Sequence, residues 1–515
     1  MNIFAKTLRR LANRMDPPRA MAKRAYSGAA FTNALANWRA SQTTGDAELR
    51  TSYRVLLNRC RELERNNPHM AAFLRAVEMN AAGPNGFTFQ SNITELRKVD
   101  GVFRLMPDEL ANSRVEDAYY RWSKPRFCSL NQQLSYPAFQ RLLARTVARD
   151  GTALIRKVRG AAARNEFNFA LQMLEVDHLD LDLFAARANG NAVKFGIEFD
   201  PDGRPVSYTI FPVHPGDTSV ASGSQRARVV IPASDMILAM LPRRISQVIG
   251  DPWIVSAMSA MQMVGKLEEY ELIAGMVCAS KMGFFVNTGE GVDTGALGTE
   301  GDTGTTIDEA VPGAFNTLPR GYDLKTFDPS HPNPDVTGFT KLILREVAVG
   351  CGVAASTLTG DLSDTNYSSM RAGLGEEREN WKMVQNWLTD TVLEPIFPEW
   401  LEMAMLSGKL NLPFAKFEKF NQPKYHGRRW TSVNPLEDAN ALKILLTMGV
   451  TSRTQYLNQN GGDFGETIAE LGIEMAQAKE LDVPIVDKDP YQNQDVAAAD
   501  KPLDNANQNT KGANS

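Results

Sequence analysis

The hydrophobic pattern is strongest over residues 336–409, where two apolar stripes at helical spacing flank a polar segment. The first stripe predicts a helix over 336–355 that ends near Gly350 and Gly352, because glycine readily takes the positive φ of a helix C-cap. The segment between the stripes, Ser356–Ser368, consists mostly of Ser, Thr, Gly, Asp and Asn, and this composition predicts a loop.

The second stripe predicts a long helix that fills 369–409. Only Glu377 and Thr391 interrupt its heptad line of apolar residues, which are Tyr367, Met370, Leu374, Trp381, Val384 and Leu388. A stripe this narrow suits the packing of helix on helix. We expect Pro395 and Pro398 to kink or end this helix, because proline lacks an N–H and clashes with the preceding turn. Judged by the periodicity alone, these segments could equally form an ordinary helical hairpin in a globular core.

Helical and strand patterns alternate upstream. Helical periodicity over 45–82 breaks at Asn67-Pro68, because proline suits the first position of a new helix. Strands are predicted over 153–158, 167–174, 193–199 and 206–211. An Asp-Gly pair at 202–203 predicts a hairpin between the last two.

A helix is predicted over 251–280, with Asp251 as its N-cap and Pro252 in its first turn. Small residues would let neighbouring helices approach it closely; they include Ser256, Ala257, Ser259, Ala260, Gly265, Ala274 and Gly275. Four charged residues between 266 and 271 interrupt the apolar run, so we expect no membrane span here.

Composition narrows the function classes. The chain has 515 residues, 43% of them hydrophobic and 23% charged, which is typical of a globular protein with two or more domains. The net charge of −4 argues against a protein whose main task is to grip nucleic-acid phosphates. The four cysteines are scattered and are expected to be reduced and buried. Residues 1–44 form a basic arm that is either solvated or in contact with nucleic acid or a neighbouring subunit.

Two charged clusters have a chemical and a structural interpretation. Arg141, Arg145 and Arg149 lie at four-residue spacing and could touch phosphate, although such stripes more often pair with acids. The second cluster could supply the carboxylates of a two-metal nuclease, and consists of Glu175, Asp177, His178, Asp180 and Asp182. Its alternation with leucine favours a half-exposed strand whose acids face water. No catalytic motif accompanies either cluster, and we predict no metal and no cofactor.

Two segments of this chain resemble the lambda-type portal proteins of tailed bacteriophages. REVAVGCGVAASTLTGDLSDTNYSSMRAG, within 345–373, and LEPIFPEWLEMAMLSGKLNLP, within 393–413, match family signatures in register. Further matches include GIEFDPDGRPVSYTI at 196–210 and residues around Trp430 and Gly462. The resemblance covers roughly 58–483.

The resemblance implies an α+β, mainly helical portal fold that assembles as a ring, expected to be a dodecamer, around a DNA channel. Its parts would be the arm (1–44), a wing (45–250), a stem helix (251–280), a clip (281–335), a second stem helix (336–355), a tunnel loop (356–368), a long kinked helix (369–409), C-terminal wing and crown helices (410–483) and a disordered tail (484–515). The location implied is the portal vertex of the virion, and the host cytoplasm during assembly.

The resemblance also implies partners and site residues. The partners would be further copies of the chain, double-stranded DNA, the terminase large subunit, a major capsid or scaffold protein and a head–tail adaptor, with no membrane. The tunnel-loop residues expected at the channel are Thr357, Thr359, Gly360, Asp361, Ser363, Thr365, Asn366 and Tyr367. The residues expected between subunits are Ala257, Gly265, Ala274 and Gly275. A metal-dependent nuclease of the packaging machinery is the alternative function.

Overall fold

The computed structural model describes residues 42–99, 102–218, 227–279, 283–287, 322–326, 334–363, 366–430, 434–459 and 464–481. Within these ranges the chain is mainly helical and carries several small antiparallel sheets, so the α+β, mainly helical prediction is confirmed. The basic arm up to residue 41, most of 281–335 and the predicted tail over 484–515 lie outside the described residues. The chain divides into two units.

Unit 1 draws its described residues from Met1–Val77, Pro125–Leu134 and Leu142–Ser363. Its larger sheets have the strand orders β11-β4-β5 and β10-β9-β8-β7-β6. The elements are α2 (Gly45–Asn66), α3 (Pro68–Val77), α5 (Pro125–Cys128), most of α6 (Tyr136–Asp150), β4 (Thr152–Arg159), β5 (Phe169–Glu175), β6 (Ala185–Ala186), β7 (Ala192–Lys194), β8 (Ile197–Phe199), β9 (Pro205–Ile210), β10 (Val229–Pro232), β11 (Met236–Met240), α7 (Met258–Ala279), β12 (Gly283–Asn287), β13 (Tyr322–Thr326), α8 (Pro334–Cys351) and α9 (Ala355–Thr359).

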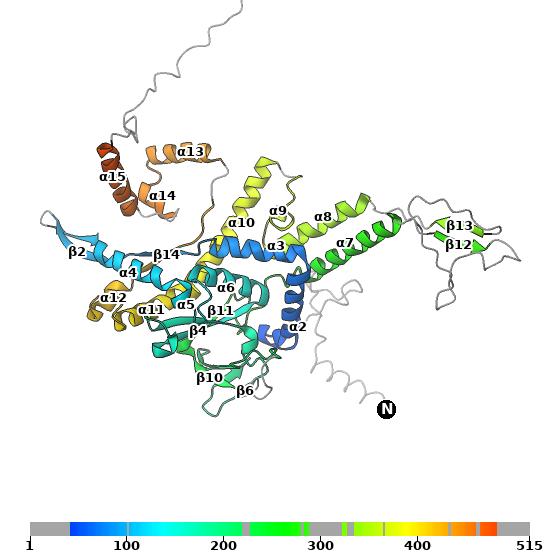
Figure 1. The fold of residues 1–515 in the computed structure, drawn as a ribbon, viewed down its shortest axis with the longest axis horizontal. Coiled ribbons are helices and arrows are strands. Elements are labelled where there is room, and N and C mark those ends of the chain that lie inside the picture. The colour runs from blue at the N-terminus through cyan, green and yellow to red at the C-terminus, as the bar shows by residue number, and fades with distance from the viewer. Residues whose placement is uncertain are drawn as a thin grey trace, which may run out of the picture. The chain divides into compact units, whose positions relative to one another are not determined.

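Helix α2 forms the core of unit 1 together with these sheets (Figure 1). Leu49, Tyr53 and Leu57 recur every four residues along α2, so they share one face and are buried against strand residues. The predicted break at Asn67-Pro68 is confirmed, since the Asn67 side chain accepts hydrogen bonds from the first amides of α3, those of His69 and Met70. Helix α2 is thus packed into the core of unit 1, and α3 begins directly after it.

Residues 193–199 form two strands where the sequence predicts one. Phe195 and Gly196 have φ of 51° and 74°, and they turn the chain so that β7 pairs antiparallel with β8. A Cβ on Gly196 would lie 2.8 Å from the Asp180 carbonyl oxygen, so a side chain does not fit there. The Asp-Gly hairpin at 202–203 is confirmed, with Gly203 at a φ of 83° between β8 and β9.

Helix α7 begins at Met258, seven residues after the predicted N-cap. The Asp251 carboxylate accepts from Gln247 Nε2 at 2.9 Å and pairs with Arg243 at 3.1 Å, so it caps no helix. Gly250 passes so close to Gly151 that a Cβ on Gly250 would lie 2.3 Å from the Gly151 carbonyl oxygen. This backbone contact holds the chain extended, and tight turns over 253–257 precede the helix.

Unit 2 draws its described residues from Glu78–Lys124, Ser135–Arg141 and Asp364–Ser515. Strand β1 pairs with β14, and β2 pairs with β3. The elements are a π-helical turn η3 (Glu78–Ala82), β1 (Thr88–Ser91), β2 (Thr94–Val99), β3 (Val102–Pro107), α4 (Glu109–Trp122), α10 (Tyr367–Leu388), a π-helical turn η9 (Thr389–Leu393), α11 (Glu394–Leu406), a short 3-10 turn (Phe414–Lys416), α12 (Phe417–Phe420), β14 (Pro423–His426), α13 (Pro435–Thr447), α14 (Arg453–Gln459) and α15 (Phe464–Glu480).

Aromatic side chains form the core of unit 2. The Tyr119 and Trp400 rings meet edge to face with centroids 4.9 Å apart, and Trp122 lies 6.0 Å from Trp400. Rings at 4.5–7 Å in such tilted arrangements add favourable interactions to the burial of apolar area. Helix α11 therefore packs one face against the core of unit 2 and leaves residues such as Glu402 exposed.

The predicted end of the long helix at its prolines does not occur. Helix α10 continues through η9 into α11, and Pro398 lies inside α11. A π-helical turn is wider than an α-helical one, and η9 immediately precedes the region of Pro395, where an α-helical turn would clash. The helix therefore continues past both prolines with a change of helix type just before them, and a kink at the prolines stays a prediction.

Candidate functional site

The region predicted as the tunnel loop begins at the end of α8. Gly352 has a φ of 70°, and its N–H bonds the Val349 carbonyl while the Val353 N–H bonds the Ala348 carbonyl, each at 3.1 Å. These two bonds form a Schellman motif, which confirms the predicted helix end at this glycine.

The predicted loop Ser356–Ser368 is partly helical, which corrects its boundaries. Helix α9 covers Ala355–Thr359, and Gly360 ends it with a φ of 71° and an N–H bond of 2.8 Å to the Ser356 carbonyl. Leu358 is buried and fixes this turn to the rest of unit 1. The irregular segment is therefore shorter than predicted, because one leucine provides the apolar contact that a short helix needs.

Several polar side chains of this segment are engaged in local structure. Thr359 Oγ1 donates to the Ala355 carbonyl at 2.9 Å. Asp361 accepts from the Ser363 hydroxyl at 2.6 Å and pairs with Lys341 at 3.1 Å. The hydrogen bonds from Ser363, and then the contact with Lys341, hold the pKa of Asp361 well below its usual range. The loop therefore presents an ionised carboxylate with its own partners.

Of the remaining residues predicted in the tunnel loop, some form part of a helix or its cap, and others lie outside the described residues. Asn366 caps α10, because its Oδ1 accepts from the Ser369 N–H at 2.8 Å. Thr357 lies within α9. Thr365 and the Tyr367 side chain lie outside the described residues. The contact of these residues with DNA stays a prediction.

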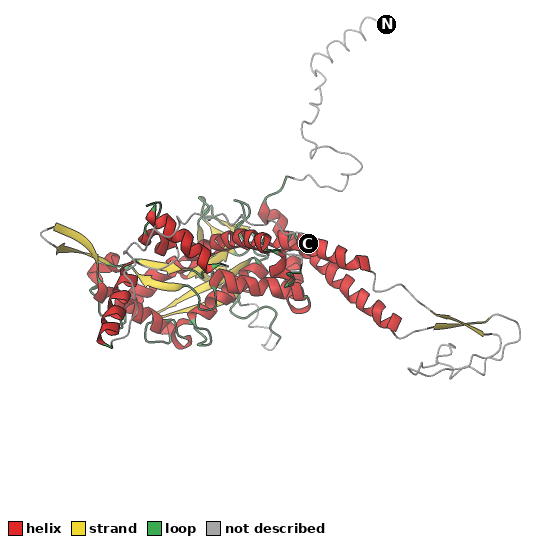
Figure 2. Ribbon diagram, turned by 90° about the horizontal axis from the view of Figure 1, so that it is seen from above, coloured by secondary structure: helices red, strands yellow, loops and turns green. Residues whose placement is uncertain are grey.

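Helices α7 and α8 lie side by side (Figure 2). Two residues before α7, the Ser256 hydroxyl donates to the Gly350 carbonyl of α8 at 3.2 Å. A Cβ on Gly350 would lie 3.0 Å from the Ala257 Cβ, so glycine is what permits this approach. The two helices are thus joined tightly within one chain.

Two of the residues predicted between subunits serve this internal packing. Ala257 is 3% exposed, so its side chain has almost no surface left for another chain. Gly265 faces Asn67 of the same unit, with 3.0 Å from a would-be Cβ to Asn67 Nδ2. Gly275 has no atom within 4 Å of its would-be Cβ, and Ala274 is half-buried. Choosing small residues as markers of a subunit contact, which we call the small-residue criterion, therefore selects two kinds of position. Some of them pack within the chain, and others lie on open surface.

Large apolar side chains, which the small-residue criterion overlooks, mark the open surface of this helix pair. Five belong to α7 and three to α8, and they lie on more than one side of α7, since the nine residue steps from Met263 to Leu272 turn the helix by about half a circle. We call the whole set the apolar stem face: Met263, Tyr270, Leu272, Ile273, Met276, Phe339, Leu342 and Val349. Their exposed fractions run from 48% for Ile273 to 80% for Val349. Exposed apolar surface of this extent on neighbouring helices is typical of an interface with another protein.

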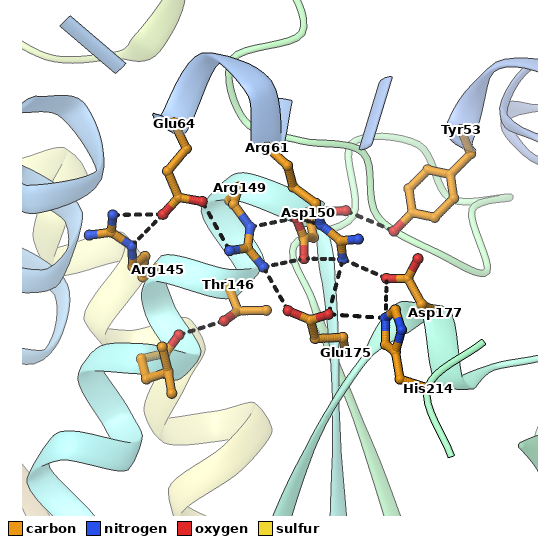
Figure 3. A network of polar contacts seen from close by, with 11 residues as sticks. Tyr53, Arg61, Glu64, Arg145, Thr146, Arg149, Asp150, Glu175, Asp177 and His214 are labelled. Carbon is orange, nitrogen blue, oxygen red and sulfur yellow. Dashed lines mark hydrogen bonds and ion pairs between the residues drawn. The ribbon is translucent and has the colours of Figure 1, made fainter. Parts of the chain in front are cut away.

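A second candidate site is the polar network beside α2 (Figure 3). Arg61 approaches Asp177 at 2.5 Å and Asp150 at 2.9 Å, and the Asp150 side chain is fully buried. Arg149 pairs with Glu64 at 3.0 Å, with Asp150 at 2.7 Å and with Glu175 at 3.3 Å. Arg145 also pairs with Glu64, at 2.6 Å. The arginines of α6 that face this network thus pair with acids. Of the two interpretations of the arginine stripe, contact with phosphate or pairing with acids, these contacts agree with the second.

The acidic cluster predicted from the sequence is divided among different partners. Asp180 is buried and pairs with Arg228 at 2.7 Å, so it does not face water as expected. Asp182 pairs with Arg54, and His178 Nδ1 bonds the Phe211 carbonyl oxygen at 2.8 Å. Only Glu175 and Asp177 remain together, because a 3-10 turn (Val176–His178) breaks the strand on which all five residues were placed.

His214 joins these two acids and completes a group that could hold a metal ion. One potential ligand atom each of Glu175, Asp177 and His214 lies within 4.8 Å of the others. Arg61 and Arg149 already contact the two carboxylates. A divalent cation would have to displace or adjoin two guanidinium groups, and this opposes metal binding electrostatically. The geometry therefore favours a structural ion-pair network.

Burial and neighbouring charges shift the pKa values of these acids in opposite directions. Burial raises the pKa of Asp177, but hydrogen bonding to Arg61 and the charges of Arg61 and His214 outweigh it and lower the pKa. The same holds for Glu64, where Arg145 and Arg149 outweigh burial. Both carboxyls are thus held ionised, as expected for acids that stabilise a fold through paired charge. Sequence reasoning missed Arg61 and His214 because they lie far along the chain from residues 175–182 and no motif links them.

Comparison with known proteins places the chain in a family context. Residues 31–385 match the model of the family described as phage portal protein, lambda family. The chain is 29% identical over 486 residues to a protein named probable portal protein from Halomonas phage phiHAP-1, covering 92% of each chain.

Solved structures were found with lower sequence identity. A chain in the virion of a native gene transfer agent particle has a TM-score of 0.42 at 14% identity, covering 83% of this chain and 98% of that one. A chain in the neck of the native particle, computed with C12 symmetry, has a TM-score of 0.40 at 14% identity and covers 78% and 92%. No helix among the described residues is long and apolar enough to cross a membrane.

Proposed function

Because the chain belongs to the lambda family of phage portal proteins, we propose that it forms the ring-shaped DNA channel at one vertex of the capsid, for genome packaging, retention and ejection. The ring would be a dodecamer, and it would dock first the terminase large subunit and then a head–tail adaptor, with a capsid or scaffold protein around it. Its role is that of a structural protein of the virion. The observation that carries the proposal is the apolar stem face, which a neighbouring copy would cover.

Ring formation explains an otherwise unfavourable surface. Burying apolar area stabilises by about 25 cal/mol per Å2, so eight large side chains left in water forgo a substantial gain. In a closed ring each chain presents this face to a neighbour, and the gain is repeated at every subunit contact. Electron micrographs of the purified full-length protein test this directly. Rings with a central opening are the expected result, and monomers at all concentrations would contradict the proposal.

A DNA channel also requires that duplex DNA slide without being held. On α10, Arg371 pairs with Glu437 and Asp438, and Lys382 pairs with Glu379 at 2.6 Å. Paired cations release few counterions on meeting a phosphate, and salt-dependent affinity stays low. We expect weak binding of duplex DNA to free rings at physiological salt. Submicromolar, sequence-specific binding would be inconsistent with a conduit.

The segment after α9 is the part that we propose touches DNA. Deleting residues 361–364 removes no residue of α9 or α10, so rings should still assemble while DNA packaging or retention falls. A matched control is the double variant Asp361→Asn, Ser363→Ala, which keeps the length of the segment but weakens its internal hydrogen bonds. The readout is the DNA content of capsids that carry each variant. Full heads with normal retention after the deletion would refute the role of this segment.

A further inference from the structure

A cavity in unit 2 gathers positive charge without acids. It has a volume of about 320 Å3 and lies between the turn that precedes β1 and the chain that leaves β14. Two arginines, a histidine, an asparagine and a threonine are among the residues that line it. The lining residues are Gly83, Pro84, Asn85, Gly86, Thr88, His426, Gly427, Arg428 and Arg429, of which none is acidic.

Glycine creates the shape of this cavity. Gly83 has a φ of 81°, and a Cβ there would lie 2.9 Å from the Arg428 Cβ. Gly86 has a φ of 71°, and a Cβ there would lie 2.5 Å from Gln140 Oε1. Both positions exclude a side chain on steric and conformational grounds. The turn can therefore approach the arginine segment closely, and backbone forms part of the cavity wall.

The two arginines play different parts. The Arg428 guanidinium is anchored, since it donates to the Met79 carbonyl and to Asn80 Oδ1. Its backbone carbonyl accepts from Gln385 Nε2 at 3.1 Å. Arg429 is exposed, and among the described residues it has no hydrogen-bond or ion-pair partner. One arginine thus fixes the wall while the next offers a free guanidinium.

The electrostatics of the cavity are unbalanced. Burial lowers the pKa of Arg428, and the like charge of Arg378 lowers it further. Partial desolvation by the surrounding protein also lowers the pKa of Arg429, although this residue remains exposed to water. An acid close by would have the opposite effect, as Asp150 has on Arg61 in unit 1, where hydrogen bonding and charge outweigh burial. Positive charge held in a cavity without a counter-charge attracts an anion.

We propose that this cavity is a binding site for a phosphate group. Guanidinium groups match the oxygens of phosphate with paired hydrogen bonds. Asn85 and Thr88 also line the cavity, and their side chains, an amide and a hydroxyl, have no partner among the described residues, so they are further potential donors to such an anion. The phosphate belongs either to the DNA backbone or to a small soluble compound, and the two sources are separable by experiment.

The test uses the full-length protein and two probes, inorganic pyrophosphate by titration calorimetry and a short labelled DNA duplex by fluorescence anisotropy. Arg429→Gln should weaken pyrophosphate binding by about tenfold or more, since a hydrogen bond to a charged group is lost. Lys416→Gln is the matched control, because Lys416 is an exposed cation of unit 2 without a partner among the described residues. It should bind pyrophosphate as the wild type does.

The measurement with the DNA duplex identifies which kind of molecule supplies the phosphate. If the site takes backbone phosphates, Arg429→Gln also lowers the slope of duplex affinity against salt by about 1. If only pyrophosphate binding falls, the site takes a small phosphate compound. Equal losses in Arg429→Gln and Lys416→Gln would reveal general charge attraction and overturn the proposal.

Further variants keep the test decisive if Arg429→Gln misfolds. Arg429→Lys retains the charge, and Thr88→Val retains the shape of the strand residue; both should reduce pyrophosphate affinity less than Arg429→Gln. Loss of ring assembly in Arg429→Glu, with pyrophosphate binding unchanged in the milder variants, would overturn the proposal and assign the cavity to a subunit contact.

Discussion

Helices α7 and α11 are both rich in apolar residues, but they use them differently. In α11 most of the apolar side chains are buried within unit 2: Ile396, Phe397, Trp400, Leu401, Ala404 and Met405, whereas Leu406 at its end is 62% exposed. In α7, Leu272 and Met276 are 68% and 64% exposed. Helix α11 is therefore completed by its own chain, whereas α7 requires a partner. The comparison teaches that apolar content alone does not separate a core helix from an assembly helix.

The largest expected effect lies in α11. Trp400→Ala should destabilise unit 2 by about 3–5 kcal/mol, because it removes a fully buried aromatic side chain and leaves a cavity. Denaturant unfolding followed by circular dichroism measures this. Trp400→Phe is the control, since the Trp400 indole N–H has no hydrogen-bond partner in the part of the chain that the structure describes, and its loss should cost less. Equal stability of Trp400→Ala and wild type would remove the contrast between the two helices.

A smaller effect is expected where α7 meets α8. Gly350→Val should overpack the contact with Ala257 and Ser256 at a cost of about 1–3 kcal/mol. Gly275→Ala is the matched control, because no atom lies within 4 Å of its would-be Cβ. Replacing a helical glycine by alanine should instead stabilise by up to about 1 kcal/mol. Thermal unfolding of both variants would show opposite shifts, and shifts in the same direction would contradict the packing described.

Acid should weaken unit 1 through its network of ion pairs. The pKa of Glu64 and that of Asp177 are lowered in the folded chain, from ordinary values of 4.5 and 3.8. Their stabilising effect is complete above these values and is lost as pH falls through the lower, folded values. Unfolding temperatures measured from neutral pH down to strong acid should therefore fall in unit 1. Asp177→Asn should flatten part of this dependence, and an unchanged profile would contradict the role of the pair.

Substitutions of exposed apolar residues on α7 should have the smallest effect on the stability of a single chain and a clear effect on ring assembly. Leu272→Gln with Met276→Gln should change the unfolding free energy of a single chain by no more than about 0.5 kcal/mol, as surface substitutions do. Ring formation, followed by size-exclusion chromatography with light scattering, should weaken strongly. Rings of normal stability would mean that the apolar stem face is not the contact between subunits.

Much of the fold could be predicted because the signals were local. Asn67-Pro68, Asp202-Gly203 and Gly352 each determine a conformation within a few residues, and the structure confirms all three. The failures involved contacts between distant residues. The N-terminus of α7 depends on Gly151 meeting Gly250, and His214 reaches Glu175 across about forty residues of chain. One sequence carries no local sign of such contacts.

The predicted contacts between subunits stay a prediction, and their basis was ambiguous. Small residues over 251–280 were taken to mark the surface between subunits, but a small residue is equally suited to a close contact within the chain, as Ala257 and Gly350 show. The exposed apolar residues of α7 and α8 were visible in the sequence. Only the structure distinguishes those that the chain itself covers from those that it leaves exposed.

The π-helical turn η9 has a consequence for how the long helix tolerates change. A π turn accommodates one residue more than an α-helical turn, so the helices on either side of it, α10 and α11, keep nearly the phase of an uninterrupted α-helix. Deleting one residue from Thr389–Leu393 would therefore restore a regular α-helix and leave Trp400 and Phe397 directed at Tyr119. Deleting one residue from the regular part of α10 would instead rotate α11 by about 100° about its axis and turn both rings away. The π turn is thus the place in the long helix where the loss of one residue should be least damaging.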